Sequence, residues 1–342
     1  MLTKFIVPAA ALSALGLAKP FNPSPARTLD QLAVGTWLEN IAVRPNGDLI
    51  ATQMAPEALV YTIRNPTGKK TQLEEIASVP AIQSIFGIAQ VPGLDEETFI
   101  FVGSNSTGIG APVTGTFSAW KVTFTTDCDT KVEVEKISDM DKNSAFLNGV
   151  AAIPGVSDAL LVADSTNGLV GRLDLASGAF DTTSFVFDEM LPVEGAGLPV
   201  GVNGIQVHNG YLYFDNSYQA SIYRIPITDD GFLVEGATPE LVVDLSSMAS
   251  FLDDFAIDAK GNLFAASNFD NTVLYHSLNS GESRIVLGSP SELIAAGDTA
   301  VAFGRGKLDQ NILYIATTGA IANPVNGTET EGAGVVALKI HV

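Results

Sequence analysis

The chain has 342 residues and a formal net charge of −20 at pH 7, from 38 acidic and 18 basic side chains. This charge excludes nucleic acid and an anionic membrane surface as expected partners, because both repel an acidic protein. Hydrophobic residues make up 46% of the chain and there are 32 glycines. Such a composition is typical of a turn-rich β protein that can bury a sizeable core.

The first 18 residues are typical of a secretory signal. Lys4 precedes an apolar run, and Gly16 and Ala18 stand at the −3 and −1 positions of a cleavage site. We therefore predict a signal peptide over residues 1–18, a mature chain over residues 19–342 and a location in the secretory pathway or outside the cell. No stretch is apolar for long enough to predict a membrane span.

Two further features bear on secretion and on stability. Acceptor sequences for N-glycosylation begin at Asn105 and Asn326, so we predict a glycoprotein. Cys128 is the only cysteine, which rules out an intrachain disulfide. The stability of the fold is therefore expected to come from packing alone.

A short sequence motif, which we call the phrase, recurs six times. Each copy is followed by predicted strands that are separated by turns rich in Gly and Asn. The copies are Leu38–Val43, Ile85–Ala89, Leu147–Ala151, Val202–Gln206, Leu252–Ala256 and Asp298–Ala302. Their second residues stand at 39, 86, 148, 203, 253 and 299. Four-stranded units of this length, repeated without a linker, are typical of a β-propeller.

The later strands of each unit follow the phrase in order. Second strands are predicted at Leu49–Thr52, Phe99–Gly103, Leu160–Asp164, Leu212–Asp215, Leu263–Ser267 and Leu313–Thr317. Third strands are predicted at Val60–Ile63, Ala119–Val122, Val170–Leu173, Ile222–Ile225, Val273–His276 and Val335–Ile340. Outer strands are predicted at Thr71–Ser78, Lys131–Ile137, Thr182–Phe187, Glu240–Asp244 and Ser283–Leu287.

The sixth unit lacks an outer strand, and the segment Arg27–Ala33 is expected to supply it. This pairing closes the ring and removes its edges. We therefore predict an all-β fold: one six-bladed β-propeller over residues 19–342, with four antiparallel strands per blade. A string of separate sandwiches is the alternative, but no linker interrupts the series.

Two long loops interrupt the regular spacing. Ser104–Thr116 in blade two and Gly319–Gly332 in blade six both join a second strand to a third. They are expected on the face where the inner strands begin, as walls of a pocket or as tolerated surface insertions.

The second residues of the six phrases are expected to meet at the central channel. They are Glu39, Phe86, Asn148, Asn203, Asp253 and Thr299. Carboxylates and carboxamides that face one another need a partner, and a hard divalent cation such as Ca²⁺ or Mg²⁺ is one. The alternative for Asn148 and Asn203 is turn chemistry, because each precedes a glycine.

With these residues in view, the chain resembles the SMP-30/gluconolactonase/LRE-like propellers over about residues 27–340. The resemblance implies that Glu39, Asn203 and Asp253 bind a divalent cation and that Asn148 contacts substrate. The sugar-lactone hydrolases of that family have an arginine two residues before this asparagine, where the chain has Phe146. Together with Trp37 and Phe86, this residue predicts a more apolar pocket than a sugar acid requires.

The opening WLENIAVRPNGDLI is also similar to the fungal hetero-Diels–Alderases of tropolone–sesquiterpenoid biosynthesis. That resemblance implies a cycloaddition between a quinone methide and a terpene alkene, positioned in an apolar pocket. Trp37, Phe86 and Phe146 are the predicted walls, and Asn148, Asn203, Asp253 and Thr299 are the predicted catalytic residues.

No G-x-S-x-G elbow, CxxC or HExxH motif occurs, and the three histidines fall outside the predicted mouth. The first hypothesis is therefore a secondary-metabolism cyclase that takes small hydrophobic substrates and uses no organic cofactor. A Ca²⁺-dependent lactone hydrolase is the second hypothesis, with Asp253 or a metal-bound water as its base. A secreted, non-catalytic binding propeller is the third.

Overall fold

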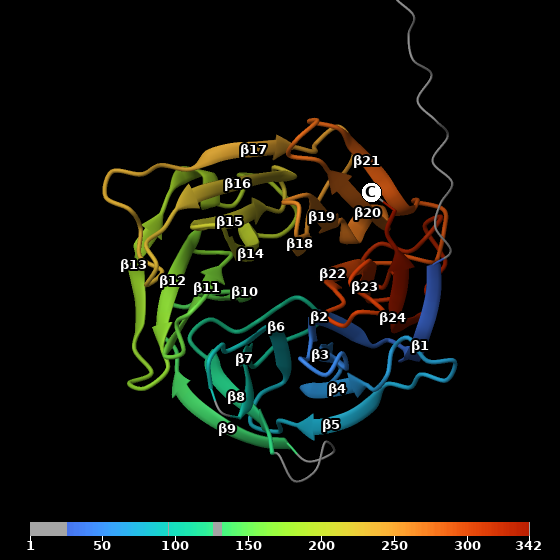
Figure 1. Ribbon diagram of the computed structural model, residues 1–342, viewed down its shortest axis with the longest axis horizontal. Coiled ribbons are helices and arrows are strands. Elements are labelled where there is room, and N and C mark those ends of the chain that lie inside the picture. Colours follow the sequence, from blue (N-terminus) through green and yellow to red (C-terminus); the bar gives the residue numbers. More distant parts are fainter. Residues whose placement is uncertain (1–25, 95, 126–131, 342) are drawn as a thin grey trace, which may run out of the picture.

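The computed structural model describes residues 26–94, 96–125 and 132–341, which form six four-stranded antiparallel sheets around a central axis (Figure 1). The predicted six-bladed β-propeller is thus confirmed. The predicted signal peptide and Cys128 lie outside the described residues. Within the described part of the chain, no helix has the length and apolar character to cross a membrane.

The first three blades follow one another along the chain. Blade one contains β2 (Trp37–Val43), β3 (Leu49–Ala55), β4 (Leu59–Ile63) and β5 (Glu74–Ser78). Blade two contains β6 (Ser84–Gln90), β7 (Glu97–Ser104), β8 (Ser118–Phe124) and β9 (Val132–Asp139). Blade three contains β10 (Leu147–Ala152), β11 (Ala159–Asp164), β12 (Leu169–Asp174) and β13 (Phe180–Val186).

The remaining blades complete the ring, and two 3₁₀ turns accompany them. Blade four contains β14 (Val202–His208), β15 (Tyr211–Asn216), β16 (Ser221–Pro226) and β17 (Glu240–Asp244). Blade five contains β18 (Phe255–Ile257), β19 (Leu263–Ala266), β20 (Thr272–His276) and β21 (Ser283–Gly288). Blade six contains β22 (Asp298–Phe303), β23 (Ile312–Thr317), β24 (Gly332–Lys339) and β1 (Ala26–Val34). The turns are η1 (Asp188–Met190) and η2 (Asn268–Asp270).

Burial along the strands follows their place in a blade. Every residue of β3 is buried, because neighbouring blades cover both faces of this sheet. The outer strand β9 has no buried residue and alternates between partly and fully exposed positions over much of its length. The hydrophobic core is therefore divided into layers between adjacent blades, such as the layer where Phe185 and Met190 of blade three and its following turn pack with Phe214 of blade four.

The N-terminal strand closes the ring as predicted. β1 pairs antiparallel with β24, and Leu29 on β1 packs with Tyr314 and Val335 of blade six. The side chain of Asp30 also accepts a hydrogen bond of 2.7 Å from the backbone N–H of Leu73 in blade one. The first described strand therefore joins the last blade to the first.

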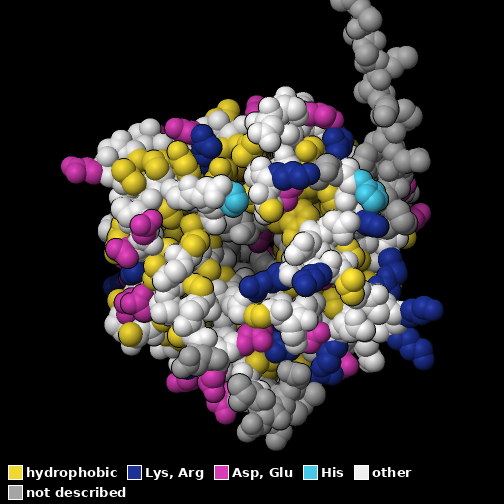
Figure 2. Space-filling view, viewed as in Figure 1, with side chains coloured by type: hydrophobic (Ala, Val, Ile, Leu, Met, Phe, Trp, Pro, Cys, Tyr) yellow, Lys and Arg dark blue, Asp and Glu magenta, His cyan; other side chains and the backbone are white. Residues whose placement is uncertain are grey.

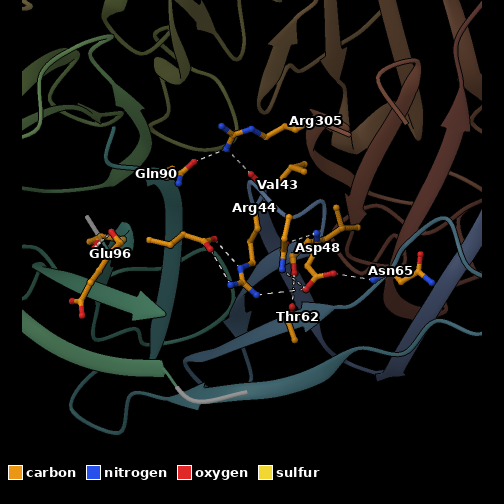
Figure 3. A network of polar contacts seen from close by, with 12 residues as sticks. Val43, Arg44, Asp48, Thr62, Asn65, Gln90, Glu96 and Arg305 are labelled. Atoms are coloured by element: carbon orange, nitrogen blue, oxygen red, sulfur yellow. Dashed lines mark hydrogen bonds and ion pairs between the residues drawn. The ribbon is translucent and has the colours of Figure 1, made fainter. Parts of the chain in front are cut away.

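Polar contacts tie three blades together where the inner strands end (Figure 3). Arg305 of blade six donates to the backbone oxygen of Val43 at 3.1 Å and to the side chain of Gln90. Arg44 forms a two-pronged ion pair with Glu97, at 2.7 and 2.9 Å, and its guanidinium lies over a phenylalanine ring. Figure 2 shows the centre of the ring as a hollow with acidic side chains inside it.

Candidate functional site

The inner strands are irregular at the second residue of the repeated phrase. The pairing of inner and second strands shifts register around Glu39, Phe86, Asn148, Asn203 and Thr299. A β-bulge bends a strand and re-aims a side chain, and in blades one, three and four the second residues Glu39, Asn148 and Asn203 face the central cavity. In blade five the strand begins only at Phe255, and Asp253 precedes it.

The glycines that follow Asn148 and Asn203 are packing positions within strands, not turn residues. A Cβ atom on Gly149 would stand 2.3 Å from the backbone oxygen of Asn203, in the next blade. A Cβ on Gly204 would stand 2.8 Å from the Cα of Asp254, again one blade further on. Glycine therefore allows neighbouring inner strands to approach closely, which explains the Asn-Gly pairs better than turn chemistry does.

A cavity of about 440 Å³ lies over the hub, within the size range of pockets for drug-sized ligands. Six residues predicted from the sequence line it: Trp37, Glu39, Phe146, Asn148, Asn203 and Asp253. Both predicted rim loops also reach it, through Ile109 and Gly110 in blade two and Ile321 and Ala322 in blade six. The two loops are therefore part of the cavity wall, as expected.

Two predicted site residues do not line the cavity. Phe86 is fully buried behind Phe146, whose ring meets it edge-on at 5.3 Å between centroids. Thr299 is also fully buried, and its hydroxyl donates to the backbone oxygen of Leu38 at 2.9 Å. The expectation that both face the channel is wrong, because neighbouring blades cover these side chains. Phe86 supports the wall from behind, and Thr299 joins blade six to blade one.

We call the polar lining residues the hub cluster: Glu39, Asn148, Asn203, Asp253 and Asn268. Each oxygen of Asp253 accepts a hydrogen bond from an amide, at 2.9 Å from Asn203 and 2.7 Å from Asn268. Asn203 also donates to the hydroxyl of Ser217 at 3.1 Å. The indole N–H of Trp37 donates to Glu39.

Burial raises the pKa of both carboxyl groups in the hub cluster. The pKa of Asp253 rises to about 7 through loss of hydration, against the opposing hydrogen bonds from Asn268 and Asn203. The pKa of Glu39 rises well above its ordinary value through burial and, next, the nearby charge of Asp253. The raised pKa values favour the acid form of these carboxyl groups, and an acid can donate a hydrogen bond.

The hub cluster does not fit a divalent cation as its side chains are arranged. A cation needs oxygen lone pairs, yet Asn203 turns its amide nitrogen toward Asp253 and Trp37 turns its N–H toward Glu39. The indole can only donate, so Oε2 of Glu39 stays occupied even where an amide reorients. No set of three His, Cys, Asp or Glu residues suited to a metal occurs within the described ranges.

Three aromatic residues that the sequence did not single out form a further part of the lining. This aromatic cluster consists of Tyr218, Phe251 and Phe269, with ring centroids 5.1 and 4.5 Å apart in succession. All three lie in connections between strands of blades four and five, where a repeat of strand phrases contains no signal. The only signal in the sequence that could have indicated these lining residues was the presence of aromatic side chains in those connections.

The segment 195–200 forms a further part of the cavity edge. Gly197, Leu198 and Val200 line the cavity, and the backbone N–H of Leu198 donates to the hydroxyl of Tyr218 at 3.1 Å. A tyrosine of the aromatic cluster thus holds this connection in place. The cavity lining combines a polar hub cluster with apolar walls from several blades.

Comparisons with known proteins agree with this architecture. No family model matches the chain. A protein of Phoma sp, named as a candidate hetero-Diels–Alderase, is 29% identical over 316 residues, which cover 86% of each chain. A second, from Sarocladium schorii, has a name of the same kind and is 26% identical over 88% of this chain and 80% of its own.

Two solved structures share the fold. The luciferin-regenerating enzyme has a TM-score of 0.65 at 13% identity and covers 93% of this chain and 95% of its own. A regucalcin from Agrobacterium tumefaciens, described as a calcium-binding protein, has a TM-score of 0.60 at 15% identity, with 93% and 94% covered. The resemblance predicted from the sequence is therefore confirmed: the chain is a six-bladed propeller similar in sequence to proteins named as hetero-Diels–Alderases and in fold to regucalcin-like proteins.

Proposed function

We propose that this protein catalyses a hetero-Diels–Alder cycloaddition between a quinone methide and a terpene alkene in the central cavity. Sequence similarity to the two relatives over most of the chain carries the proposal. The lining of the cavity supports it, because apolar walls face a compact polar cluster.

The apolar walls have the task of holding two hydrophobic partners together. Phe146 and Trp37 stand near the hub, and the aromatic cluster supplies further apolar surface. Binding both partners in a near-attack geometry makes the reaction effectively unimolecular and removes much of its entropic barrier. This contribution requires no acid, base or nucleophile.

The hub cluster has the task of binding the quinone methide oxygen. One C–C bond and one C–O bond form while three π bonds become one, so no proton, electron or leaving group is exchanged and no organic cofactor is needed. Negative charge grows on the quinone methide oxygen as the electron-rich alkene adds. The Asn148 amide and the acid form of Asp253 are donors that stabilise this charge in a buried site.

The test is turnover with a quinone methide generated in solution and a cyclic sesquiterpene alkene. Chiral chromatography should show one enantiomer of the adduct, formed faster than in buffer alone. A racemic product formed at the same rate as in buffer would contradict the proposal. A non-catalytic binding propeller would give that result.

Lactone hydrolysis has no comparable support in the cavity. The regucalcin-like neighbours show the fold alone, and the hub cluster is occupied by N–H donors. A chelator added to the cycloaddition assay should leave the rate unchanged, whereas a Ca²⁺-dependent lactonase would lose its activity.

A further inference from the structure

Asn268 has an unusual backbone conformation at the edge of the cavity. It begins the turn η2 in blade five, its φ is +43°, and its side chain is almost fully buried. A residue other than glycine seldom adopts this left-handed conformation, although asparagine tolerates it better than most. Such strain persists where the surrounding structure holds it, and it often marks a functional site.

The side chain of Asn268 holds one oxygen of a carboxyl group in the hub cluster. Its amide nitrogen donates to Oδ2 of Asp253 at 2.7 Å, while Asn203 holds Oδ1 at 2.9 Å. The two amides come from different blades, and each donates to a different oxygen of the Asp253 carboxyl group. Rotation of the carboxyl group about its last side-chain bond would break both hydrogen bonds.

Asn271, three residues later, provides an internal comparison. It also has a left-handed backbone, with φ +55°, and it is also buried. Its side-chain oxygen accepts a hydrogen bond of 2.8 Å from the backbone N–H of Gly297, and it does not line the cavity. The same backbone conformation therefore places the side chain of Asn271 against the loop at Gly297 and the side chain of Asn268 against Asp253 in the cavity.

We propose that Asn268 is a positioning residue that fixes the direction in which Asp253 presents its carboxyl group to the substrate. This inference rests on the proposed function, because Asp253 is the group that meets the quinone methide oxygen. A misdirected donor stabilises the transition state less, while the apolar walls bind the substrates as before.

The decisive variant is Asn268→Gly, because glycine adopts the left-handed backbone without strain and removes only the amide. We expect an unchanged or higher Tm, a kcat lowered about 10- to 100-fold and a KM within about twofold of the original value. Asn271→Gly is the matched control: it relieves the same backbone conformation, and its kcat should stay within about twofold. A second variant, Asn268→Asp, keeps the shape but replaces the donor with an acceptor, and it should lose kcat as well.

A double-mutant cycle with Asp253→Ala separates positioning from turn structure. If Asn268 acts through Asp253, the losses in kcat are not additive and the double variant is about as slow as Asp253→Ala alone. Full kcat in Asn268→Gly, or additive losses, would overturn the inference. Absence of cycloadduct with the unmodified protein would instead overturn the proposed function, so the two failures are distinguishable.

Discussion

At the scale of single residues, Phe146 decides the character of the cavity. It precedes Asn148 by two positions, lines the cavity and packs on Phe86. The sequence predicted Phe146 as a wall of the substrate pocket, and the residue lines the cavity, but the sequence could not show that Phe86 lies behind it. Which of two aromatic side chains faces the cavity depends on the neighbouring blade.

Phe146→Arg should lower kcat/KM for the cycloaddition about 10- to 100-fold. The change replaces buried apolar surface worth about 1.5–3 kcal/mol with a charged group in the wall. Phe146→Leu, which stays apolar, should retain most of the activity. Equal kcat/KM values for the two variants would show that the wall does not bind substrate.

Asp298 is a buried carboxyl group outside the cavity lining, and it should make the stability of the ring depend on pH. The pKa of this carboxyl group is raised well above its ordinary value, mainly because the group is buried. The folded state therefore binds a proton that the unfolded state has already released, so stability falls as pH rises from the ordinary pKa through the raised one. Asp298→Asn should increase the free energy of unfolding at pH 8 and flatten its pH dependence above pH 4. Urea denaturation at several pH values measures this, and an unchanged slope would contradict it.

At the scale of elements, the inner strands could be predicted because the sequence phrase that forms them is repeated six times. Each phrase predicted an inner strand, and the strand pairing shifts register around the second residue in five of them. Three of these residues, Glu39, Asn148 and Asn203, line the cavity. The connections between strands were not predictable in this way. Tyr218, Phe251 and Phe269 line the cavity from segments that follow no repeat.

Tyr218→Phe should loosen the segment 195–200 without unfolding the ring. The variant lacks the oxygen that accepts the Leu198 N–H at 3.1 Å but keeps the ring that packs on Phe251. Hydrogen–deuterium exchange should become faster in this segment, and kcat/KM should fall a few-fold. Tyr223→Phe is the control, because its hydroxyl bonds Gln219 at 2.6 Å within blade four. Unchanged exchange in 195–200 would show that the hydroxyl does not hold the segment.

At the scale of the whole molecule, closure by β1 makes the ring one cooperative structure. The strand pairs with the last blade and contacts the first, so its side chains stabilise two blades at once. Asp30 illustrates this, because it accepts a backbone hydrogen bond from Leu73 of blade one.

Leu29→Ala should lower the free energy of unfolding by about 2–5 kcal/mol, because it leaves a cavity in the core layer between blade six and blade one. Val34→Ala on the same strand should change it by less than about 0.5 kcal/mol, since Val34 is 69% exposed. Chemical denaturation measures both values. Equal effects would mean that β1 contributes little to closure.

The repeating phrases by themselves determined the six-bladed fold, its closure and the residue type at the start of each inner strand. These features follow from local alternation and spacing, which a sequence contains directly. The tertiary structure alone decided that Phe86 and Thr299 are covered, that Asn268 and the aromatic cluster reach the cavity, and that N–H donors surround Asp253 and Glu39. Such contacts join residues from different blades, and their geometry exists only once the ring has closed.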